Sequence, residues 1–474
     1  MSVPNAIQFK RRARRMKLIF QGSVIFVLVA VAIVGAFQLD VVREYFSRAS
    51  GEPANIVIDT KFVVGPLPRP WRNLAQGGEG HDWLLQPLAP QVKAINTEYV
   101  RLDHIYDFYD IVQGTSGNLT FNFSKLDPVL DGITAAGAKP YIALSYMPPV
   151  ISSGDIISTP RDWNEWQLVV QKTVEHISGT RGISDVYYEV WNEPDLFGGF
   201  KYYGDKNYLT MYTYSAQGAA NARGVRPFKI GGPAITALYK NWIEALAKHS
   251  LRNNLRLDFI SWHRYSMDID DYVDDAVNAR TWMQQYPQLA ATEFHITEWG
   301  HDSRNHAGYD GALGAAHTVA GSIEMAGRVD RAFIFEIQDG KDPAGQAMWG
   351  RWGMFTHKDA GAQAKPRYRA LQMLERLGGE RLQLFGKGSW VKAIAALDGE
   401  ENVGVVLANY DQFGRNIENV PITFSNILPG SYTITKQLSN GQQFTETIAT
   451  TAAQLQTQFL MPANTYGFVQ MVKN

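Results

Sequence analysis

Residues 187–200 read YYEVWNEPDLFGGF, an apolar and aromatic run that ends abruptly in Asn-Glu-Pro. Aromatic and β-branched residues favour a buried strand, and Pro194 cannot donate a hydrogen bond to a neighbouring strand. The stretch therefore predicts a strand that ends at Asn192 and Glu193. The end of a strand on a rigid scaffold is a common position for a functional residue. Glu193 is such a candidate, and a catalytic role requires a partner.

The same kind of strand-like run recurs along the chain, and amphipathic segments at 162–177, 208–222 and 316–327 separate several of the runs. The eight runs are 61–65, 98–103, 139–145, 186–191, 228–233, 257–263, 294–299 and 331–337. Strands that alternate with helices indicate a parallel sheet, and eight units over about 310 residues fit a closed (β/α)₈ barrel. An open, doubly wound sheet is the alternative, but no Gly-rich phosphate-binding loop follows the first run.

The composition changes near residue 380, where short strand-like runs alternate with turn residues. Such a pattern predicts a small antiparallel β-sandwich. We therefore expect an α/β chain with the barrel over residues 58–378 and the sandwich over residues 379–474.

The N-terminal region has the pattern of a membrane anchor. Residues 1–17 contain six Lys or Arg and no acid, and residues 18–37 contain no charge. Twenty helical residues span roughly 30 Å, the thickness of a bilayer core. We predict a basic cytoplasmic tail (1–17), a single transmembrane helix (18–39) and a linker (40–57). By the positive-inside rule the N-terminus lies in the cytoplasm and the barrel outside it. A cleaved signal peptide is the alternative, although VGAFQLD is a poor cleavage site.

The overall composition excludes several classes of function. The chain has 474 residues, a net charge of −1 and no Cys. A near-neutral chain presents no overall surface for a polyanion, so we expect no nucleic-acid partner, and the basic run is interpreted as a topology signal. Without Cys there is no disulfide, thiolate metal ligand or thiol nucleophile. Nothing in the sequence indicates an oligomeric state.

A second carboxylate, Glu298, follows the seventh strand-like run, so a barrel would bring it to the same mouth as Glu193. Paired carboxylates suit glycoside hydrolysis, in which one acid is protonated and the other ionised. Hydrogen bonds from Arg101 and Tyr265 would favour the ionised form of Glu298, and the apolar neighbours of Glu193 would favour its protonated form. Alternatively, Arg101 forms a structural ion pair with a carboxylate of the barrel interior, such as Glu189 or Glu336.

These segments resemble the retaining glycoside hydrolases of clan A, which are built on (β/α)₈ barrels. WNEP after the fourth strand and ITEW at the seventh look like their acid/base and nucleophile segments. EVWNEPDLF, SYMPP (145–149) and GMF…KPRYRAL (353–371) resemble glycoside hydrolase family 39, which includes β-xylosidases, α-L-iduronidases and membrane-anchored exopolysaccharide hydrolases.

The resemblance implies a role for each of several residues. Glu193 would be the general acid/base and Glu298 the nucleophile. The resemblance implies a carbohydrate substrate and no metal or organic cofactor. The remaining predicted substrate-site residues are Asn192 at a sugar hydroxyl, Arg101 and Tyr265 at Glu298, His263 and His104 in the subsite, and Trp299, for which packing is the alternative to sugar stacking.

The sequence also departs from the family. Asp103-His104 stands where the second strand usually offers His-Gly. At the eighth strand Phe335 or Glu336 stands near the usual sugar-stacking Trp, and Trp349 or Trp352 would supply the ring from a loop.

We therefore expect a membrane-anchored retaining glycosidase, outside the cytoplasm, that acts on a cell-envelope or extracellular polysaccharide or oligosaccharide. The alternative is a non-catalytic carbohydrate-binding or scaffold protein of a polysaccharide export or biofilm assembly.

Overall fold

The computed structural model describes most of the chain after residue 50. The described residues are 51–77, 81, 83–304, 306–341, 347–349, 351–399 and 402–474. The predicted basic tail, the predicted anchor and most of the predicted linker lie outside them. Among the described residues, no helix has the length and apolar character needed to cross a membrane.

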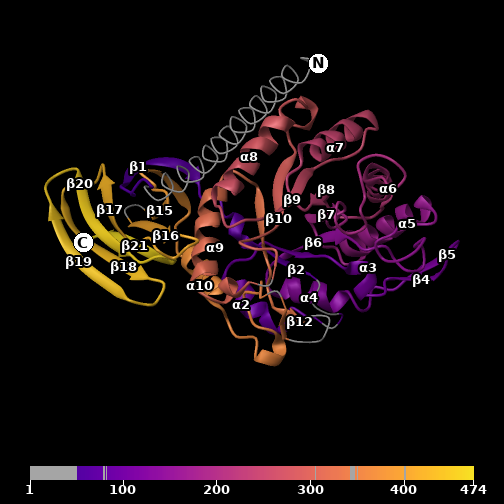
Figure 1. Cartoon of the computed structure of the whole chain (residues 1–474), viewed down its shortest axis with the longest axis horizontal. Coiled ribbons are helices and arrows are strands. Elements are labelled where there is room, and N and C mark those ends of the chain that lie inside the picture. The colour runs from indigo at the N-terminus through magenta and orange to yellow at the C-terminus, as the bar shows by residue number, and fades with distance from the viewer. Residues whose placement is uncertain are drawn as a thin grey trace, which may run out of the picture. The chain divides into compact units, whose positions relative to one another are not determined.

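Eight parallel strands close into a barrel in the order β10-β11-β2-β3-β6-β7-β8-β9. Figure 1 shows helices on the outside of these strands. The strands are β2 (Asn73–Gln76), β3 (Tyr99–Leu102), β6 (Lys139–Leu144), β7 (Val186–Val190), β8 (Phe228–Ile235), β9 (Phe259–Tyr265), β10 (Glu293–Gly300) and β11 (Arg331–Phe335). The predicted closed barrel is confirmed, and the open sheet is excluded.

Helices follow the barrel strands in sequence. They are α2 (Ala89–Ala94), α3 (Ile105–Phe108), α4 (Asp127–Ala135), α5 (Trp163–Val174), α6 (Tyr208–Asn221), α7 (Lys240–Arg252), α8 (Asp270–Met283), α9 (Ala312–Met325) and α10 (Pro366–Leu374). Two hairpins interrupt the pattern, namely β4 (Val112–Thr115) with β5 (Asn118–Phe121), and β12 (Gly340–Lys341) with β13 (Ala347–Trp349).

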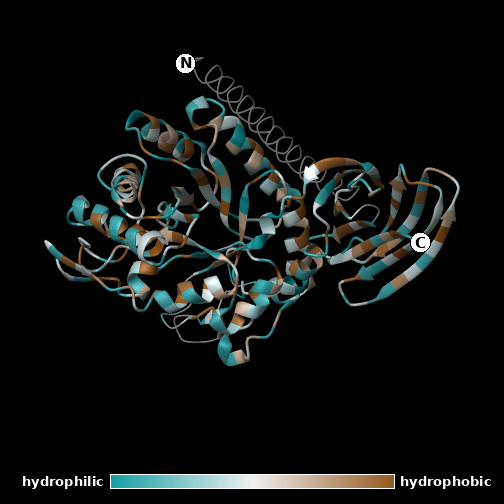
Figure 2. Ribbon diagram, turned by 180° about the vertical axis from the view of Figure 1, so that it is seen from behind, coloured by the Kyte–Doolittle hydropathy of each residue, from teal (hydrophilic) through white to brown (hydrophobic). Residues whose placement is uncertain are grey.

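The second domain is built on a nine-stranded β-sheet. Its strands are β1 (Ile56–Pro66), β14 (Glu380–Phe385), β15 (Val391–Asp398), β16 (Asn402–Asn409), β17 (Glu418–Ser425), β18 (Gly430–Leu438), β19 (Gln443–Thr450), β20 (Gln454–Met461) and β21 (Thr465–Lys473). Buried and exposed residues alternate along β17 and β20, and Figure 2 shows hydropathy varying along these strands. The buried faces enclose a separate apolar core, as expected of a β-sandwich.

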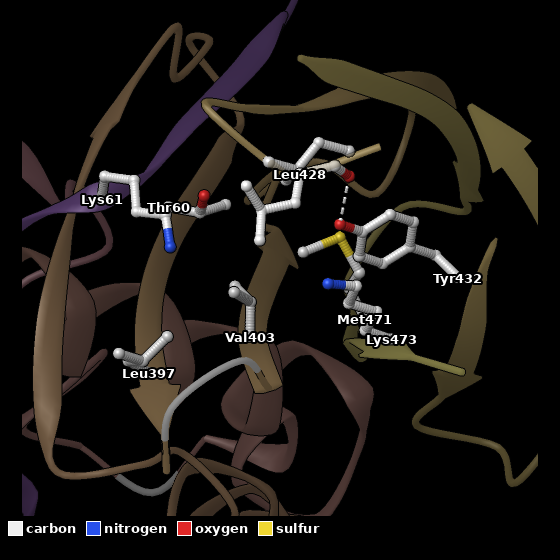
Figure 3. A pocket seen from close by; sticks show the side chains of 9 residues that line it. Thr60, Lys61, Leu397, Val403, Leu428, Tyr432, Met471 and Lys473 are labelled. Atoms are coloured by element: carbon white, nitrogen blue, oxygen red, sulfur yellow. Dashed lines mark hydrogen bonds between the residues drawn. The ribbon is translucent and has the colours of Figure 1, made fainter. Parts of the chain in front are cut away.

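The prediction for the first barrel strand is wrong. Residues 61–65 belong to β1, which pairs with β14 and, in parallel, with β17. Thr60 and Lys61 of β1 line one small pocket with Tyr432 and Lys473, as Figure 3 shows. The first barrel strand is instead β2, a run of only four residues in which Leu74 is the one bulky apolar side chain. The predicted barrel boundary at residue 58 therefore places β1 in the wrong domain.

The β domain packs against helix α9, with which β15, β16 and β21 make contact. Lys387 pairs with Glu324 of α9 at 2.7 Å, and the Tyr410 hydroxyl donates to the Met267 carbonyl at 2.8 Å. Helix α9 is therefore covered by the barrel on one side and by the sheet on the other. This placement explains why all but its first two residues are buried.

Candidate active site

Aromatic side chains close the floor of the barrel beneath the site. This cluster comprises Ala75, Tyr99, Tyr141, Tyr187, Phe259 and Phe333, with Phe335 packed against it. Side chains two residues further along a strand face the same interior, so Arg101 and Glu189 lie in the next layer. Both are fully buried. The site is built on this layer, at the carboxyl ends of the strands, where barrel enzymes place their chemistry.

Arg101 is the centre of the hydrogen-bond network. Its Nε donates to Glu189 at 2.7 Å, one terminal nitrogen donates to Glu298 at 2.9 Å, and the other donates to Asn192 Oδ1 at 2.7 Å. Burial alone would lower the pKa of Arg101, but the charges of Glu189 and Glu298 raise it. The guanidinium therefore stays charged, and it fixes groups from β7 and β10 in one plane. The structural and catalytic pairings considered for Arg101 both occur.

Glu298 lies in a cage of donors at the end of β10. One carboxylate oxygen accepts from Arg101, and the other accepts from the Tyr265 hydroxyl at 2.8 Å. Burial raises the pKa of Glu298, and the charges of His263 and Arg101 act in the opposite direction. The net shift is upward. Arg101 and Tyr265 favour the ionised form as expected, but desolvation outweighs the charges that lower the pKa.

Glu193 lies just beyond β7, and its backbone adopts the left-handed conformation at φ 44°. Its N–H donates to the Ala234 carbonyl at 2.9 Å, which ties this strained residue to the end of β8. Its Oε1 lies 2.8 Å from His263 Nδ1, which is also 3.5 Å from Glu298. Burial alone would lower the pKa of His263, but the charge of Glu298 and the hydrogen bond with Glu193 raise it.

The two glutamates face each other across the mouth. One oxygen of Glu193 and one of Glu298 lie within 4.8 Å of each other, with the His263 nitrogen between them. Retaining glycosidases place their carboxyl groups about 5–5.5 Å apart, whereas inverting enzymes leave roughly 6.5–9.5 Å for a water molecule. Carboxylate oxygens this close agree with the shorter spacing of a retaining site.

Asn192 and His104 border the glutamates. Asn192 accepts from Arg101 and donates its Nδ2 to the Tyr146 hydroxyl at 2.9 Å. The ring of His104 meets that of Tyr146 edge-on at 4.6 Å, and its Nδ1 lies 2.8 Å from Asp107. The structure thus places His104 at the same mouth, separated from the glutamates by Tyr146.

The prediction that Trp299 contacts substrate is wrong. Its side chain is fully buried and packs outside the barrel, with ring contacts to Tyr272 at 5.6 Å and His317 at 5.9 Å. At the eighth strand, half-buried Phe335 lies 6.4 Å from Tyr265 and 5.6 Å from Trp352 between ring centroids. Phe335 and Trp352 therefore border the site as expected, while the side chain of Trp349 lies outside the described residues.

Glu193, His263 and Glu298 are close enough to share a metal ion on distance alone. The charged Arg101 guanidinium already lies 2.9 Å from Glu298, however, and it supplies the positive charge that a metal would bring. The arrangement suits proton transfer and nucleophilic attack by carboxylates.

Two site residues were not predicted from the sequence. Tyr146 is buried and positions Asn192. The sequence feature that points to Tyr146 is its place in the SYMPP segment. Glu189 was considered only as a structural partner of Arg101. Glu189 follows the inward-facing Tyr187 by two residues and therefore also faces the barrel interior. A carboxylate buried there requires a cation, and this requirement identifies Glu189 as the partner of Arg101.

Two such carboxylates across the mouth of a barrel are the arrangement that glycoside hydrolases use. Residues 56–417 match the family described as glycosyl hydrolases family 39, and the chain belongs to that family. It is a glycosidase, and a retaining mechanism is typical of the family.

Individual relatives agree with this assignment. A β-xylosidase from Caldicellulosiruptor saccharolyticus is 27% identical over 339 residues, covering 66% of this chain and 67% of that protein. A β-xylosidase from Geobacillus stearothermophilus is 24% identical over 302 residues, covering 56% and 58% respectively. The crystal structure of a monomeric β-xylosidase from Caulobacter crescentus CB15 aligns with a TM-score of 0.72 at 18% identity, covering 89% of this chain and 99% of that chain. This last similarity supports the fold.

Proposed function

We propose that this chain hydrolyses β-linked glycosides, with xylosides as the first class to test, and that it acts by double displacement on a cell-envelope or extracellular polysaccharide or oligosaccharide. The observation that carries the mechanism is the pair of carboxylates, whose oxygens lie within 4.8 Å and whose hydrogen-bond partners differ. The β-xylosidases among its relatives support the choice of sugar.

In the first step, a Glu298 oxygen attacks the anomeric carbon while the glycosidic C–O bond breaks. The leaving oxygen takes a proton from Glu193. This step leaves a glycosyl ester on Glu298. Arg101 and Tyr265 hold the attacking carboxylate in place through their hydrogen bonds. Asn192, fixed between Arg101 and Tyr146, is positioned to bind a sugar hydroxyl.

In the second step, water attacks the anomeric carbon and gives its proton to Glu193. The ester bond breaks, Glu298 regains its charge, and the sugar leaves with its configuration retained. His263 holds the Glu193 carboxyl at 2.8 Å, so the His263–Glu193 pair keeps the shuttled proton at the site.

The location of the enzyme is part of the proposal. The basic residues 1–17 and the uncharged residues 18–37 support a single membrane-spanning anchor with the barrel outside the cytoplasm. The test is fractionation of cells that produce the full chain or a chain lacking residues 1–39. The full chain should sediment with membranes and the shortened chain should not. Equal behaviour of the two chains would contradict the anchor.

The catalytic roles are tested with the full chain in detergent, using 4-nitrophenyl β-D-xylopyranoside and xylobiose. Glu298→Gln should lose several orders of magnitude in kcat/KM on both substrates, because the first step then lacks its nucleophile. Glu193→Gln should lose far more kcat/KM on xylobiose than on 4-nitrophenyl β-D-xylopyranoside. The sugar leaving group needs a proton before it can leave, whereas 4-nitrophenolate does not. Exposed Glu380→Gln is the matched control and should retain activity. Wild-type enzyme that cleaves no β-glycoside, or variants that retain full activity, would overturn the proposal.

A further inference from the structure

Four large apolar or aromatic side chains lie exposed on the two loops that follow β7 and β8. We call them the aromatic rim: Leu196, Phe197, Tyr203 and Tyr239, which are 60%, 40%, 55% and 42% exposed. A single exposed apolar residue is ordinary, but a group beside an active site indicates a binding surface.

The rim is rigidly attached to the proposed acid/base residue. The N–H groups of Leu196 and Phe197 both donate to the Glu193 carbonyl, at 3.0 and 2.7 Å. The N–H of Thr236 donates to Asp195 at 3.1 Å and so joins the β8 loop to the β7 loop. These loops therefore hold their exposed rings at fixed positions relative to Glu193.

Ring contacts and a hydrogen bond support the outer part of the rim. The ring of Tyr202 lies 5.0 Å from that of Tyr203 and 5.7 Å from that of Trp242. The side chain of Asn241, two residues after Tyr239, donates to the Tyr202 hydroxyl at 3.2 Å. An aromatic surface that is fixed before ligand arrives loses little conformational entropy on binding.

The inner end of the rim reaches the site itself. The ring of Phe197 lies edge-on against that of Tyr146, with 5.8 Å between centroids. The Tyr146 hydroxyl accepts from Asn192, the neighbour of Glu193. Phe197 therefore packs against the residue that positions Asn192, next to Glu193 in the chain.

The position of the rim identifies which part of a substrate it meets. Strands β7 and β8 lie on the Glu193 side of the barrel, and β10, which carries Glu298, is separated from β7 by two strands. In a retaining mechanism the acid/base group lies at the leaving oxygen. A surface that extends outward from Glu193 therefore faces the leaving group.

We propose that the aromatic rim binds the leaving-group side of a β-linked oligosaccharide, with Phe197 stacking on the first sugar and the outer rings contacting the sugars beyond it. Pyranose rings present flat C–H faces that pack on aromatic side chains. This inference rests on the proposed function, and it makes the preferred substrate a chain with at least two sugars beyond the scissile bond.

The test compares kcat/KM for xylobiose to xylopentaose with kcat/KM for 4-nitrophenyl β-D-xylopyranoside, using the full chain. Wild type should gain about tenfold between two and four sugars. In Phe197→Ala and Tyr239→Ala, the ratio of tetraose to aryl-xyloside kcat/KM should fall by a similar factor. Phe444, which is 55% exposed on β19, provides the control, since Phe444→Ala should leave that ratio unchanged. A flat dependence on chain length, or an unchanged ratio in both rim variants, would overturn the inference.

Failure of the proposed function is recognised separately. If wild type cleaves no xyloside, the rim is tested by calorimetric titration of Glu298→Gln with xylotetraose and cellotetraose. Binding that weakens in the double variant with Phe197→Ala supports the rim as an oligosaccharide surface. The absence of binding to both tetrasaccharides overturns it.

Discussion

At the residue scale, the two glutamates have different partners. Glu298 is held by a permanent cation and a phenol, whereas Glu193 is held by a titratable imidazole. Arg101 tolerates full burial because three acceptors surround it, and removing any of these partners would leave a buried polar group unpaired. The nucleophile is consequently immobile, and the acid/base residue lies in a pair that can exchange a proton.

The Tyr265→Phe variant tests how the charge of Glu298 is maintained. Glu298 attacks as a carboxylate, and burial places its pKa above the usual 4.5. Removing the phenol hydrogen bond destabilises the charged form, so the pKa rises further. The acid limb of the pH profile of kcat/KM should move to higher pH by about one unit.

The matched control for that variant is Tyr432→Phe, which removes a hydroxyl in the β domain that donates to the Leu428 carbonyl at 2.6 Å. Its acid limb should coincide with that of wild type. An acid limb that stays in place or moves to lower pH in Tyr265→Phe would show that this hydroxyl does not stabilise the ionised Glu298.

At the element scale, a bulge in β10 decides what the site contains. Ile296 pairs with Trp262, and the next pair joins Glu298 to His263, so Thr297 is an extra residue. The bulge reverses the alternation of side chains, turning Glu298 inward and Trp299 outward. Strict alternation from the inward-facing His295 would give the opposite result. The strand and Glu298 were predictable from the sequence, but the direction of Trp299 was not.

The Trp299→Ala variant tests the outward position of this side chain. The ring packs against α9, where a Cβ at Gly321 would lie 2.8 Å from it. Its removal should lower the free energy of unfolding in urea by about 3–5 kcal/mol. Trp299→Phe should cost much less, because the indole nitrogen has no hydrogen-bond partner among the described residues. A Trp299→Ala enzyme of normal stability with a raised KM would instead indicate a sugar-stacking role.

At the scale of the whole molecule, the β domain contains strands from both ends of the described chain. Strand β1 belongs to it, the barrel strands follow, and β14 to β21 complete the same sheet. Ile58 pairs with Leu384 of β14 and Phe424 of β17, more than 300 residues later in the chain. The last seven barrel strands were predicted because each is a local apolar run. The sequence did not predict that β1 belongs to the β domain, because pairing with strands so far along the chain leaves no local pattern. It also did not predict β2 as the first barrel strand, because β2 is shorter and more polar than β1.

Two substitutions within β1 test this long-range pairing. Ile58 is fully buried, whereas Phe62 is 51% exposed. Ile58→Asp places an unpaired charge in the sandwich core, so it should lower the melting temperature and speed amide exchange in β17. Phe62→Asp should change neither measurably. Unaltered exchange in β17 of Ile58→Asp would contradict the placement of β1 in this sheet.

The most direct test of the central claim is to trap the covalent intermediate. The full chain would be treated with 2,4-dinitrophenyl 2-deoxy-2-fluoro-β-D-xyloside, whose fluorine slows the second step, and then digested for mass spectrometry. We predict one fluoroxylosyl group per chain, carried as an ester on Glu298 and absent from Glu298→Gln. An active enzyme that carries no label, or carries it on Glu193, would contradict the account.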